Sequence, residues 1–276
     1  MNRARRLVKP TSIHVILIIV TLVNLFPLYY MISTSFKGDI EVINNQLGLP
    51  SSLGIDNYQV LLVQKGFPRL FLNTVTVSVF SVSIALAISC LAAYALARLD
   101  FWGRQPILDI ITAFMAIPPI VVIIPLFVLM SSVRLINQYP SAIIAYIGFI
   151  LPFSVFILTG YFCSIPQELL DAGKIDGANE LRLLIDIILP LSKAPLITLA
   201  IVNGLWVWNE LLIALMFLQR EEMRTLMVGI AYLYGRNARN IPLIMSGSVL
   251  ASLPMLIILA FGQRYFVRGL TAGAVK

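Results

Sequence analysis

Charged residues are scarce in this chain of 276 residues, and their scarcity is the first constraint on its class. Asp, Glu, Lys and Arg make up 12% of the chain, against about 25% in soluble domains. Hydrophobic residues reach 59%. The net charge of +7 would point to nucleic acid in a soluble protein, but in a chain this apolar the basic residues are better explained as topology signals in loops. We therefore predict a membrane protein that crosses the bilayer several times and binds no nucleic acid.

Residues for metal, redox and nucleotide chemistry are also scarce. The two cysteines, Cys90 and Cys163, lie inside apolar runs, which excludes a disulfide framework and predicts buried, unreactive thiols. The chain has one histidine, His14, and one histidine cannot form a His-based metal site or a relay of several imidazoles. No G-x-x-x-x-G-K-[ST] motif occurs, so the chain has no P-loop for ATP. We expect no catalytic residue, no metal and no cofactor on this chain.

Long apolar runs are what the sequence does contain. About 20 helical residues cross a hydrocarbon core of ~30 Å, and lipid offers open backbone groups no partner, so helices are expected. The predicted fold is all-α, with residues 1–276 as a single transmembrane domain. Its core spans fall within 71–266, and residues 1–70 hold a first span and an external loop. The six spans are expected at roughly 13–33, 71–97, 107–130, 141–163, 196–218 and 244–266.

The basic residues predict the direction of these spans. With a cytoplasmic N-terminus, twelve of the 20 Lys and Arg residues fall on the cytoplasmic side and eight fall outside. The cluster Arg3–Lys9 decides the orientation, because the first span usually dominates. This start also resembles a signal peptide, but its apolar stretch is too long and no A-x-A-like site follows, so we interpret it as an uncleaved span. Both termini and the segment 164–195 are then predicted to be cytoplasmic.

The segment 166–190 is polar and has the pattern of two short helices. Pro166 suits a first helical turn, and Glu168 and Asp171 carry negative charge near the helix N-terminus, where it is favourable. Gly177 supplies a left-handed stop before a second helix. A helix that lies on lipid needs Lys and Arg on its polar face, whereas this one is net acidic. We therefore predict that the segment docks on a soluble partner protein.

The same segment resembles the cytoplasmic loop of the ABC importer permeases. That loop reads E-A-A, three residues, Gly, nine residues and I-x-L-P. Here Asp171-Ala172-Gly173 stands at E-A-A, Gly177 follows after three residues, and Ile187–Pro190 completes the pattern. Asp replaces Glu at 171, which keeps the charge on a side chain one methylene shorter. Gly replaces Ala at 173, which costs up to ~1 kcal/mol of helix propensity.

Other motifs are similar to the carbohydrate-uptake branch of this family. They are Phe71-Leu-Asn-Thr74, Ala93-Tyr-Ala-Leu-Ala-Arg98, Asp176-Gly-Ala178, Trp208-Asn-Glu210 and the ending Tyr265–Val275. The resemblance implies a non-catalytic permease subunit of a maltose-type, binding-protein-dependent sugar importer in a bacterial or archaeal cytoplasmic membrane. It also implies three kinds of partner besides lipid: a second homologous permease subunit, usually a different chain, two copies of a cytoplasmic ATPase that binds ATP and Mg, and an extracytoplasmic solute-binding protein.

The resemblance assigns the contact with the ATPase to a coupling helix between spans four and five. It implies Asp171 as the acidic contact and places the tail from Arg264 near the ATPase. The coupling residues expected on this basis are Glu168, Leu169, Leu170, Asp171, Ala172, Gly173, Asp176 and Gly177.

Glu210 is the acidic residue that the pattern places well inside a span. An acid at a helix centre costs about 2.5–3.5 kcal/mol on insertion scales and usually faces the bundle interior or a watery cavity. It is a candidate for the solute pathway, and the competing explanation is that it pairs with a basic or polar group of the partner subunit and only holds helices together. The rings of Trp206 and Trp208 are of a kind that stacks on sugars, but they also suit packing. The pathway candidates are Asn73, Asn203, Trp206, Trp208, Asn209 and Glu210.

Two other classes stay open from the sequence. A secondary transporter driven by an ion gradient would use Glu210 as its coupling site, but paired intramembrane acids and evident inverted repeats are lacking. A membrane scaffold without transport leaves Glu210 unexplained. The sequence does not name the solute; the lack of Lys and Arg deep in the predicted spans favours a neutral sugar.

Overall fold

The computed structural model describes residues 2–236 and 240–272, with side chains described for 13–234 and 240–263. The cluster Arg3–Lys9 and the ending Tyr265–Val275 therefore lie outside the described side chains. Within the described ranges the chain forms helices and turns and no strand, as the predicted all-α fold requires. Contacts divide it into two compact units, residues 1–68 with 229–253 and residues 69–228 with 254–276.

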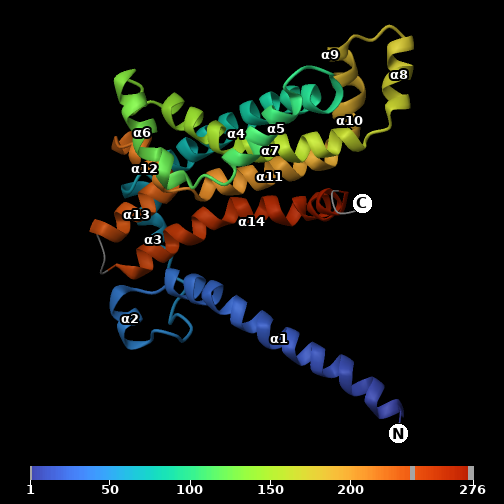
Figure 1. The fold of residues 1–276 in the computed structure, drawn as a ribbon. Coiled ribbons are helices and arrows are strands. Elements are labelled where there is room, and N and C mark those ends of the chain that lie inside the picture. Colours follow the sequence, from blue (N-terminus) through green and yellow to red (C-terminus); the bar gives the residue numbers. More distant parts are fainter. Residues whose placement is uncertain (1, 237–239, 273–276) are drawn as a thin grey trace. The chain divides into compact units, whose positions relative to one another are not determined.

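The first unit contains the long N-terminal helix and the loop that follows it (Figure 1). The side chains of residues 13–29 are exposed and mostly apolar, which is the surface that lipid requires. The elements are α1 (Asn2–Ser35), α2 (Asp39–Asn44), α3 (Asp56–Gln59), the π-helical turn η1 (Val60–Gln64), most of α13 (Leu226–Arg236) and the first half of α14 (Ile241–Ala272).

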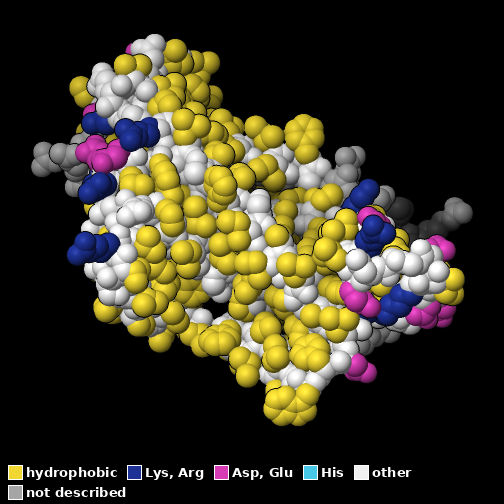
Figure 2. All heavy atoms as spheres, turned by 90° about the horizontal axis from the view of Figure 1, so that it is seen from above, with side chains coloured by type: hydrophobic (Ala, Val, Ile, Leu, Met, Phe, Trp, Pro, Cys, Tyr) yellow, Lys and Arg dark blue, Asp and Glu magenta, His cyan; other side chains and the backbone are white. Residues whose placement is uncertain are grey.

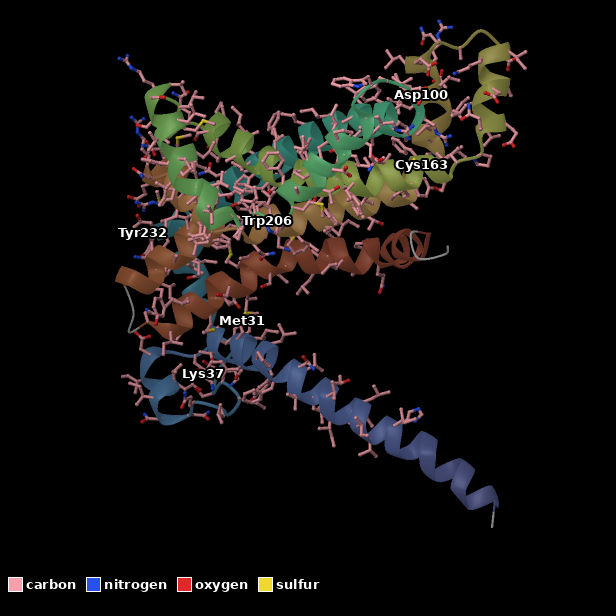
Figure 3. All side chains as sticks on the ribbon, viewed as in Figure 1. Met31, Lys37, Asp100, Cys163, Trp206 and Tyr232 are labelled. Atoms are coloured by element: carbon pink, nitrogen blue, oxygen red, sulfur yellow. The ribbon has the colours of Figure 1, made fainter. Side chains whose placement is uncertain are left out.

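A buried lysine organises the loop after α1. Lys37, labelled in Figure 3, is only 1% exposed. Its Nζ donates to the carbonyl oxygens of Asn45 (2.8 Å), Gln46 (3.3 Å) and Gly48 (2.6 Å). The side chain of Asn45 closes the same turn, because its Oδ1 accepts from the amide of Gly48 (2.9 Å) and its Nδ2 donates to the carbonyl of Leu49 (3.0 Å). The ammonium group thus draws residues 45–48 together.

Replacing Lys37 by methionine is expected to open this loop. The stem of the side chain is kept, but three carbonyls lose their donor, and a buried polar group without a partner costs about 1–3 kcal/mol. Chymotrypsin should then cut the membrane-inserted chain within residues 38–55 roughly tenfold faster. Lys65→Met, at an exposed position of the same unit, is the control and should leave the rate unchanged. Equal cleavage of the Lys37 variant and the wild type would contradict this role of Lys37.

The second unit is built around α7. Ala142, Ala145, Tyr146 and Ile150 of α7 belong to one hydrophobic cluster, and Leu158 and Phe162, nearer its far end, belong to another. Helices α5, α6, α11 and α12 all contact α7. The elements are α4 (Phe67–Arg98), α5 (Arg104–Phe114), α6 (Pro119–Ser132), α7 (Tyr139–Ser164), α8 (Gln167–Ile175), α9 (Glu180–Arg182), π-helical η2 (Leu183–Ile188), α10 (Leu189–Leu191), α11 (Lys193–Asn209), α12 (Leu212–Phe217), the 3-10 turn η3 (Glu221–Met223) and α14 from Pro254.

Four helices among the described residues are long and apolar enough to cross a membrane: Ile13–Ser35, α4, α7 and Ile241–Gln263. Two further candidates are pairs of helices, α5 with α6, bent by 100°, and Glu180–Leu191 with α11, bent by 79°. The described chain therefore offers four to six spans, and the count of six stays a prediction. The predicted third span is not one straight helix.

Two prolines divide the predicted third span, 107–130. Helix α5 ends at Phe114, and α6 begins at Pro119 with Pro118 as its extended N-cap (ψ 135°). Proline lacks an amide hydrogen and disfavours helical geometry in the residue before it. The amides of Met115 and Ala116 instead turn back to carbonyls three residues earlier, at 3.1 Å each. Hydropathy alone does not reveal such a break, because both halves are apolar.

Candidate functional site

The polar segment forms a helical hairpin at one end of α7 (Figure 1). Its first arm is α8, and its second is the continuous helical run Glu180–Leu191; residues 167–191 are called the hairpin below. Gly177 has φ of +81° and its amide donates to the carbonyl of Lys174 (3.0 Å), so it provides the left-handed stop. Asn179 caps the second arm, because its Oδ1 accepts from the amide of Arg182 (2.9 Å). The two predicted helices and the glycine turn are confirmed.

The inner face of α8 packs against the second arm. Leu170 is 2% exposed and shares a cluster with Leu183 and Ile188, and with residues from the ends of α4 and α7. Gly173 lies so close to the second arm that a Cβ atom there would be 2.7 Å from Cδ2 of Leu183 and from Cδ1 of Ile187. The glycine that departs from E-A-A therefore permits the close approach of the two arms.

The opposite face of α8 is exposed and mixes acidic with apolar side chains. Ile175 is 87% exposed and Leu169 is 44% exposed. Glu168, Asp171 and Ala172 are also exposed. Asp176 and Gly177 form the exposed turn at the end of the helix. Apolar side chains this exposed beside carboxylates suit the surface of a partner protein with basic groups.

A row of hydrogen bonds leads from α4 to Asp171. Arg98, in the last turn of α4, donates from Nη1 to Oε1 of Gln167 (3.0 Å) and from Nη2 to the carbonyls of Phe162 and Ile165. Gln167 in turn donates from Nε2 to Oδ1 of Asp171 (2.9 Å). The orientation of the Asp171 carboxylate thus depends on a side chain outside the hairpin.

A second contact joins α4 to both arms of the hairpin. The hydroxyl of Tyr94 donates to Oε2 of Glu180, and Nζ of Lys174 lies 3.2 Å from Oε1 of the same carboxylate. The Tyr94 hydroxyl and then the Lys174 ammonium hold the pKa of Glu180 below its usual value, so this carboxylate is ionised at neutral pH. Sequence reasoning assigned no role to Tyr94, Arg98, Gln167 or Glu180. The feature of the sequence that could have indicated them is the spacing of Tyr94 and Arg98 by four residues, which places both side chains on one face of the helix.

Glu210 lies at a break between two helices rather than inside one. Helix α11 ends at Asn209, Glu210 is extended (ψ 132°), and α12 begins at Leu212. The carboxylate accepts from the amides of Leu212 (2.7 Å) and Ile213 (2.9 Å) and from the hydroxyl of Tyr146 (2.9 Å). It therefore caps α12 and ties this helix to α7. The prediction of a continuous helix over 196–218 is wrong at this residue, because the acid itself supplies the acceptors that begin a new helix.

The two candidate tryptophans pack against other aromatic rings. Trp208 is 4% exposed, and its ring meets the edge of Phe71 with 5.7 Å between centroids. Trp206, labelled in Figure 3, is 37% exposed and meets Tyr146 at 6.1 Å, close to perpendicular. Trp206 therefore keeps part of its ring exposed, whereas Trp208 is enclosed.

The asparagine candidates are bonded within the chain. Asn203 is buried and donates to Oγ of Ser154 (2.8 Å), which joins α11 to α7. Asn209 is exposed and donates to the carbonyl of Leu205 (2.8 Å). Both side chains have local structural roles, and Asn209 also lies open to solvent or solute.

Asn73 joins the start of α4 to two other elements. It is 4% exposed, its Oδ1 accepts from the hydroxyl of Tyr139 (2.7 Å), and its Nδ2 donates to the carbonyls of Glu222 and Arg224 (2.9 Å each). These bonds hold the loop after α12 against α4. The asparagine of the Phe71–Thr74 motif therefore has a structural role, and no contact with a solute is needed to explain it.

A cavity of about 320 Å³ lies beside Trp208, between α4, α11 and the middle of α14. Ser78 and Ser83 are its polar residues, and the rest of the wall is apolar. A sugar needs several convergent hydrogen-bonding groups. This cavity therefore does not have the lining of a sugar site. Its other lining residues are Phe71, Val75, Val79, Val82, Ala200, Gly204, Trp208, Pro254, Met255 and Ile258.

The prediction of buried thiols is confirmed for Cys90 and wrong for Cys163. Cys90 is 8% exposed, whereas Cys163 is exposed in the last turn of α7 (Figure 3), where the helix leaves the core. Its Sγ lies 4.0 Å from the carbonyl oxygen of Ala97. Within the described ranges, no three His, Cys, Asp or Glu side chains are grouped closely enough to hold a metal ion.

Charged side chains gather at two ends of the face shown in Figure 2, with apolar side chains over the broad area between them. In the second unit, one end of α7 carries the hairpin. The other end carries the loop 219–224, which Asn137 holds by accepting from the amides of Gln219 and Arg220 (2.7 and 2.9 Å). An apolar band between two polar ends is the surface that a bilayer requires. The fold and surface thus define a helical, multi-pass membrane protein with an exposed polar hairpin at one end of α7.

Comparison with known proteins identifies the family. Residues 85–272 match the binding-protein-dependent transport system inner membrane component, and the chain belongs to this family. It is 40% identical over 257 residues to the putative ABC transporter permease protein ORF2 of Caldicellulosiruptor sp. strain Rt8B.4, and the match covers 93% of each chain. It is 35% identical over 261 residues to the arabinooligosaccharides transport system permease protein AraQ of Halalkalibacterium halodurans, again covering 93% of each.

A solved structure agrees with this assignment. A bacterial ABC transporter involved in the import of the acidic polysaccharide alginate has a chain that is 26% identical, with a TM-score of 0.83 over 96% of this chain and 99% of that one. The resemblance inferred from the sequence motifs is confirmed. The protein is therefore a multi-pass protein of the cytoplasmic membrane.

Proposed function

We propose that this chain is the non-catalytic permease subunit of an ATP-driven ABC importer for a carbohydrate, and that residues 1–276 act as one permease domain. The family assignment and a relative named for arabinooligosaccharide transport support this proposal. The observation that carries it is the exposed face of α8, where Leu169 and Ile175 stand beside Glu168 and Asp171. A loop that only joined two spans would have no use for such a face.

In this proposal α8 is the coupling helix and docks into a groove of a cytoplasmic ATPase. Leu169, Ala172 and Ile175 would be buried there, and Asp171 would pair with a basic group. The remaining coupling residues act within the hairpin: Leu170 and Gly173 hold α8 against the second arm, and Asp176 and Gly177 form its terminal turn. ATP and Mg are bound by the partner ATPase, present in two copies. A second, homologous but different permease subunit completes the pathway, and an external binding protein delivers the solute.

The geometry of Glu210 favours this function over the ion-driven alternative. A coupling carboxylate has to exchange a proton or bind an ion during each cycle. Both oxygens of Glu210 already accept hydrogen bonds from Leu212, Ile213 and Tyr146. The carboxylate therefore stabilises the break between α11 and α12, and neither of its oxygens is free to bind an ion without losing a hydrogen bond.

The proposed solute is a neutral oligosaccharide. No Lys or Arg lies deep within α4, α7 or α11; Arg69, Arg98 and Lys193 stand at helix ends. An acidic sugar would require basic groups along the pathway. Trp206, which keeps an exposed ring, and Asn209 are the pathway candidates that remain accessible to such a solute.

The combined substitutions Asp171→Ala and Gly177→Ala test the proposal. The first removes the acidic contact, and the second places a Cβ on a residue with φ of +81°, which distorts the end of α8. Uptake driven by Mg-ATP should fall more than about tenfold, since a lost charged contact of 2 kcal/mol or more reduces binding by this factor. Proteoliposomes with the second permease, the ATPase and the binding protein would be assayed with labelled arabino-oligosaccharides and alginate oligosaccharides.

The matched control is Asp109→Ala. Asp109 is an exposed acid on α5 whose Oδ1 accepts from Gln105 at 2.9 Å, the same local arrangement as Gln167 with Asp171. The control should retain uptake, and both variants should insert in the membrane like the wild type. Full uptake in the double variant would refute the coupling role. Uptake by the chain alone under a proton or sodium gradient would favour the secondary transporter.

A further inference from the structure

We propose that the last turn of α4 is the mechanical link between the hairpin and the membrane spans, with Tyr94 and Arg98 as positioning residues. This inference rests on the proposed function, because it names how movement of the coupling helix reaches the rest of the permease. The inference also gives a role to the Ala93–Arg98 motif, which the docking of α8 by itself does not explain.

Arg98 fastens the junction between α7 and α8. The two helices are joined only by Ile165 and Pro166, both extended (ψ 130° and 136°), and a pair of extended residues transmits little torque. The Arg98 guanidinium bridges this joint, because it binds the last carbonyls of α7 and the first side chain of α8, Gln167. A cation at the carbonyl end of a helix is also favoured by the helix dipole. Arg98 thereby makes the end of α7 and the start of α8 one body.

Tyr94 fastens the far part of the hairpin. It lies one helical turn before Arg98, is 5% exposed, and bonds Glu180 at the start of the second arm. Glu180 also pairs with Lys174 near the end of α8 at 3.2 Å. A single tyrosine hydroxyl therefore connects α4 to both arms. Arg98 holds the hairpin at the start of its first arm, and Tyr94 holds it at the start of its second arm. Rotation of α8 against α4 therefore requires that one of these contacts break.

The shape of α4 explains why this link is useful. The helix runs unbroken for 32 residues, from Phe67 to Arg98, a length of about 48 Å at 1.5 Å per residue. Its far end is tied through Asn73 to the loop after α12. By contrast, α11 is separated from the hairpin by a bend of 79°. Because α4 is one continuous helix, a displacement of the hairpin moves α4 as a rigid body and reaches the opposite end of the second unit.

The test measures whether the hairpin and α4 move as one body. Spin labels are placed at Phe80→Cys on α4 and Ile185→Cys on the second arm, both exposed, in a chain with Cys163→Ala, assembled with its permease and ATPase partners. In this labelled chain with no other substitution, the distance between the two labels should show one narrow distribution. Addition of Mg-ATP should leave that distribution unchanged. Tyr94→Phe, Arg98→Met and Glu180→Ala should each widen the distribution about twofold and make it shift on addition of Mg-ATP.

Two further variants separate positioning from packing. The combination Tyr94→Phe with Glu180→Ala should be no wider than Glu180→Ala alone, because either change by itself already removes the bond between the Tyr94 hydroxyl and the Glu180 carboxylate. Tyr139→Phe, which removes a tyrosine hydroxyl bond at the other end of α7, should match the wild type. Since Glu180 is exposed, its substitution does not threaten folding even if a change at buried Tyr94 does.

The outcomes distinguish the two proposals. If the ATPase co-purifies with every variant and the distributions stay narrow, the link through Tyr94 and Arg98 is refuted while the coupling function stands. If the ATPase fails to co-purify with the wild-type chain, the proposed function itself fails, and the link with it. Wider, ATP-sensitive distributions with the ATPase still bound support both.

Discussion

Glu210→Ala is expected to destabilise the second unit by about 2–4 kcal/mol, because the change removes a helix cap and leaves three donors, two of them on the buried residues Tyr146 and Ile213, without this acceptor. The amides of Leu212 and Ile213 and the hydroxyl of Tyr146 all lose their partner at once. In a membrane, water does not replace that partner readily. Thermal unfolding of the detergent-purified chain and the amount inserted in the membrane measure the effect.

Glu210→Gln separates the cap from an ion-coupling role. The amide side chain keeps an oxygen that accepts from the start of α12, but it carries no charge and exchanges no proton. We therefore expect a loss of about 1 kcal/mol in stability, as for a weakened neutral hydrogen bond, and uptake driven by Mg-ATP close to that of the wild type. Loss of uptake in a chain that unfolds like the wild type would instead support the ion-driven alternative.

Gly173→Leu is expected to impair coupling strongly while leaving the spans intact. A Cβ at this position would already be 2.7 Å from the side-chain ends of Leu183 and Ile187, and a leucine extends further into the same space. Overpacking of this kind costs about 1–3 kcal/mol, and here α8 relieves it by leaving the second arm. The acidic face would then be misplaced, so uptake driven by Mg-ATP should fall more than about tenfold.

The control and the rescue for this prediction come from the same unit. At Gly160 on α7 a Cβ would meet no atom within 4 Å, so Gly160→Leu should retain uptake. Adding Ile187→Ala to Gly173→Leu removes one of the two obstructing side chains and should restore part of the uptake. Gly173→Ala should be mild, because only the flexible ends of two side chains have to move. Normal uptake with Gly173→Leu would show that the close packing of the two arms is not needed for coupling.

The class of the protein and its hairpin were predictable because both depend on local properties of the chain. Long apolar runs predict membrane helices wherever they occur, since lipid admits no other backbone arrangement for a span of this kind. In the same way, Pro166 and Gly177 act through their own backbone restrictions, and both stand where the pattern placed them, at the start and the end of α8.

The helix breaks were less predictable, although their causes are visible in the sequence. Pro118 and Pro119 lie within an apolar run, and a proline in a membrane helix either kinks it or ends it, depending on which neighbours satisfy the freed carbonyls. Glu210 was expected inside a span because its surroundings are apolar. Its role as a cap depends on the folding of its carboxylate back onto Leu212 and Ile213, and on contact with Tyr146, 64 residues away.

Hydropathy, turn residues and motif spacing are local properties of the chain, and they were sufficient to predict a helical membrane protein of the importer permease family with an acidic hairpin. The contacts that hold this hairpin in place could be found only from the folded chain. Tyr94 meets Glu180 across 86 residues, and Arg98 meets Gln167 across 69. Such pairs depend on which helix faces pack together, and spacing along the chain carries no information about that choice.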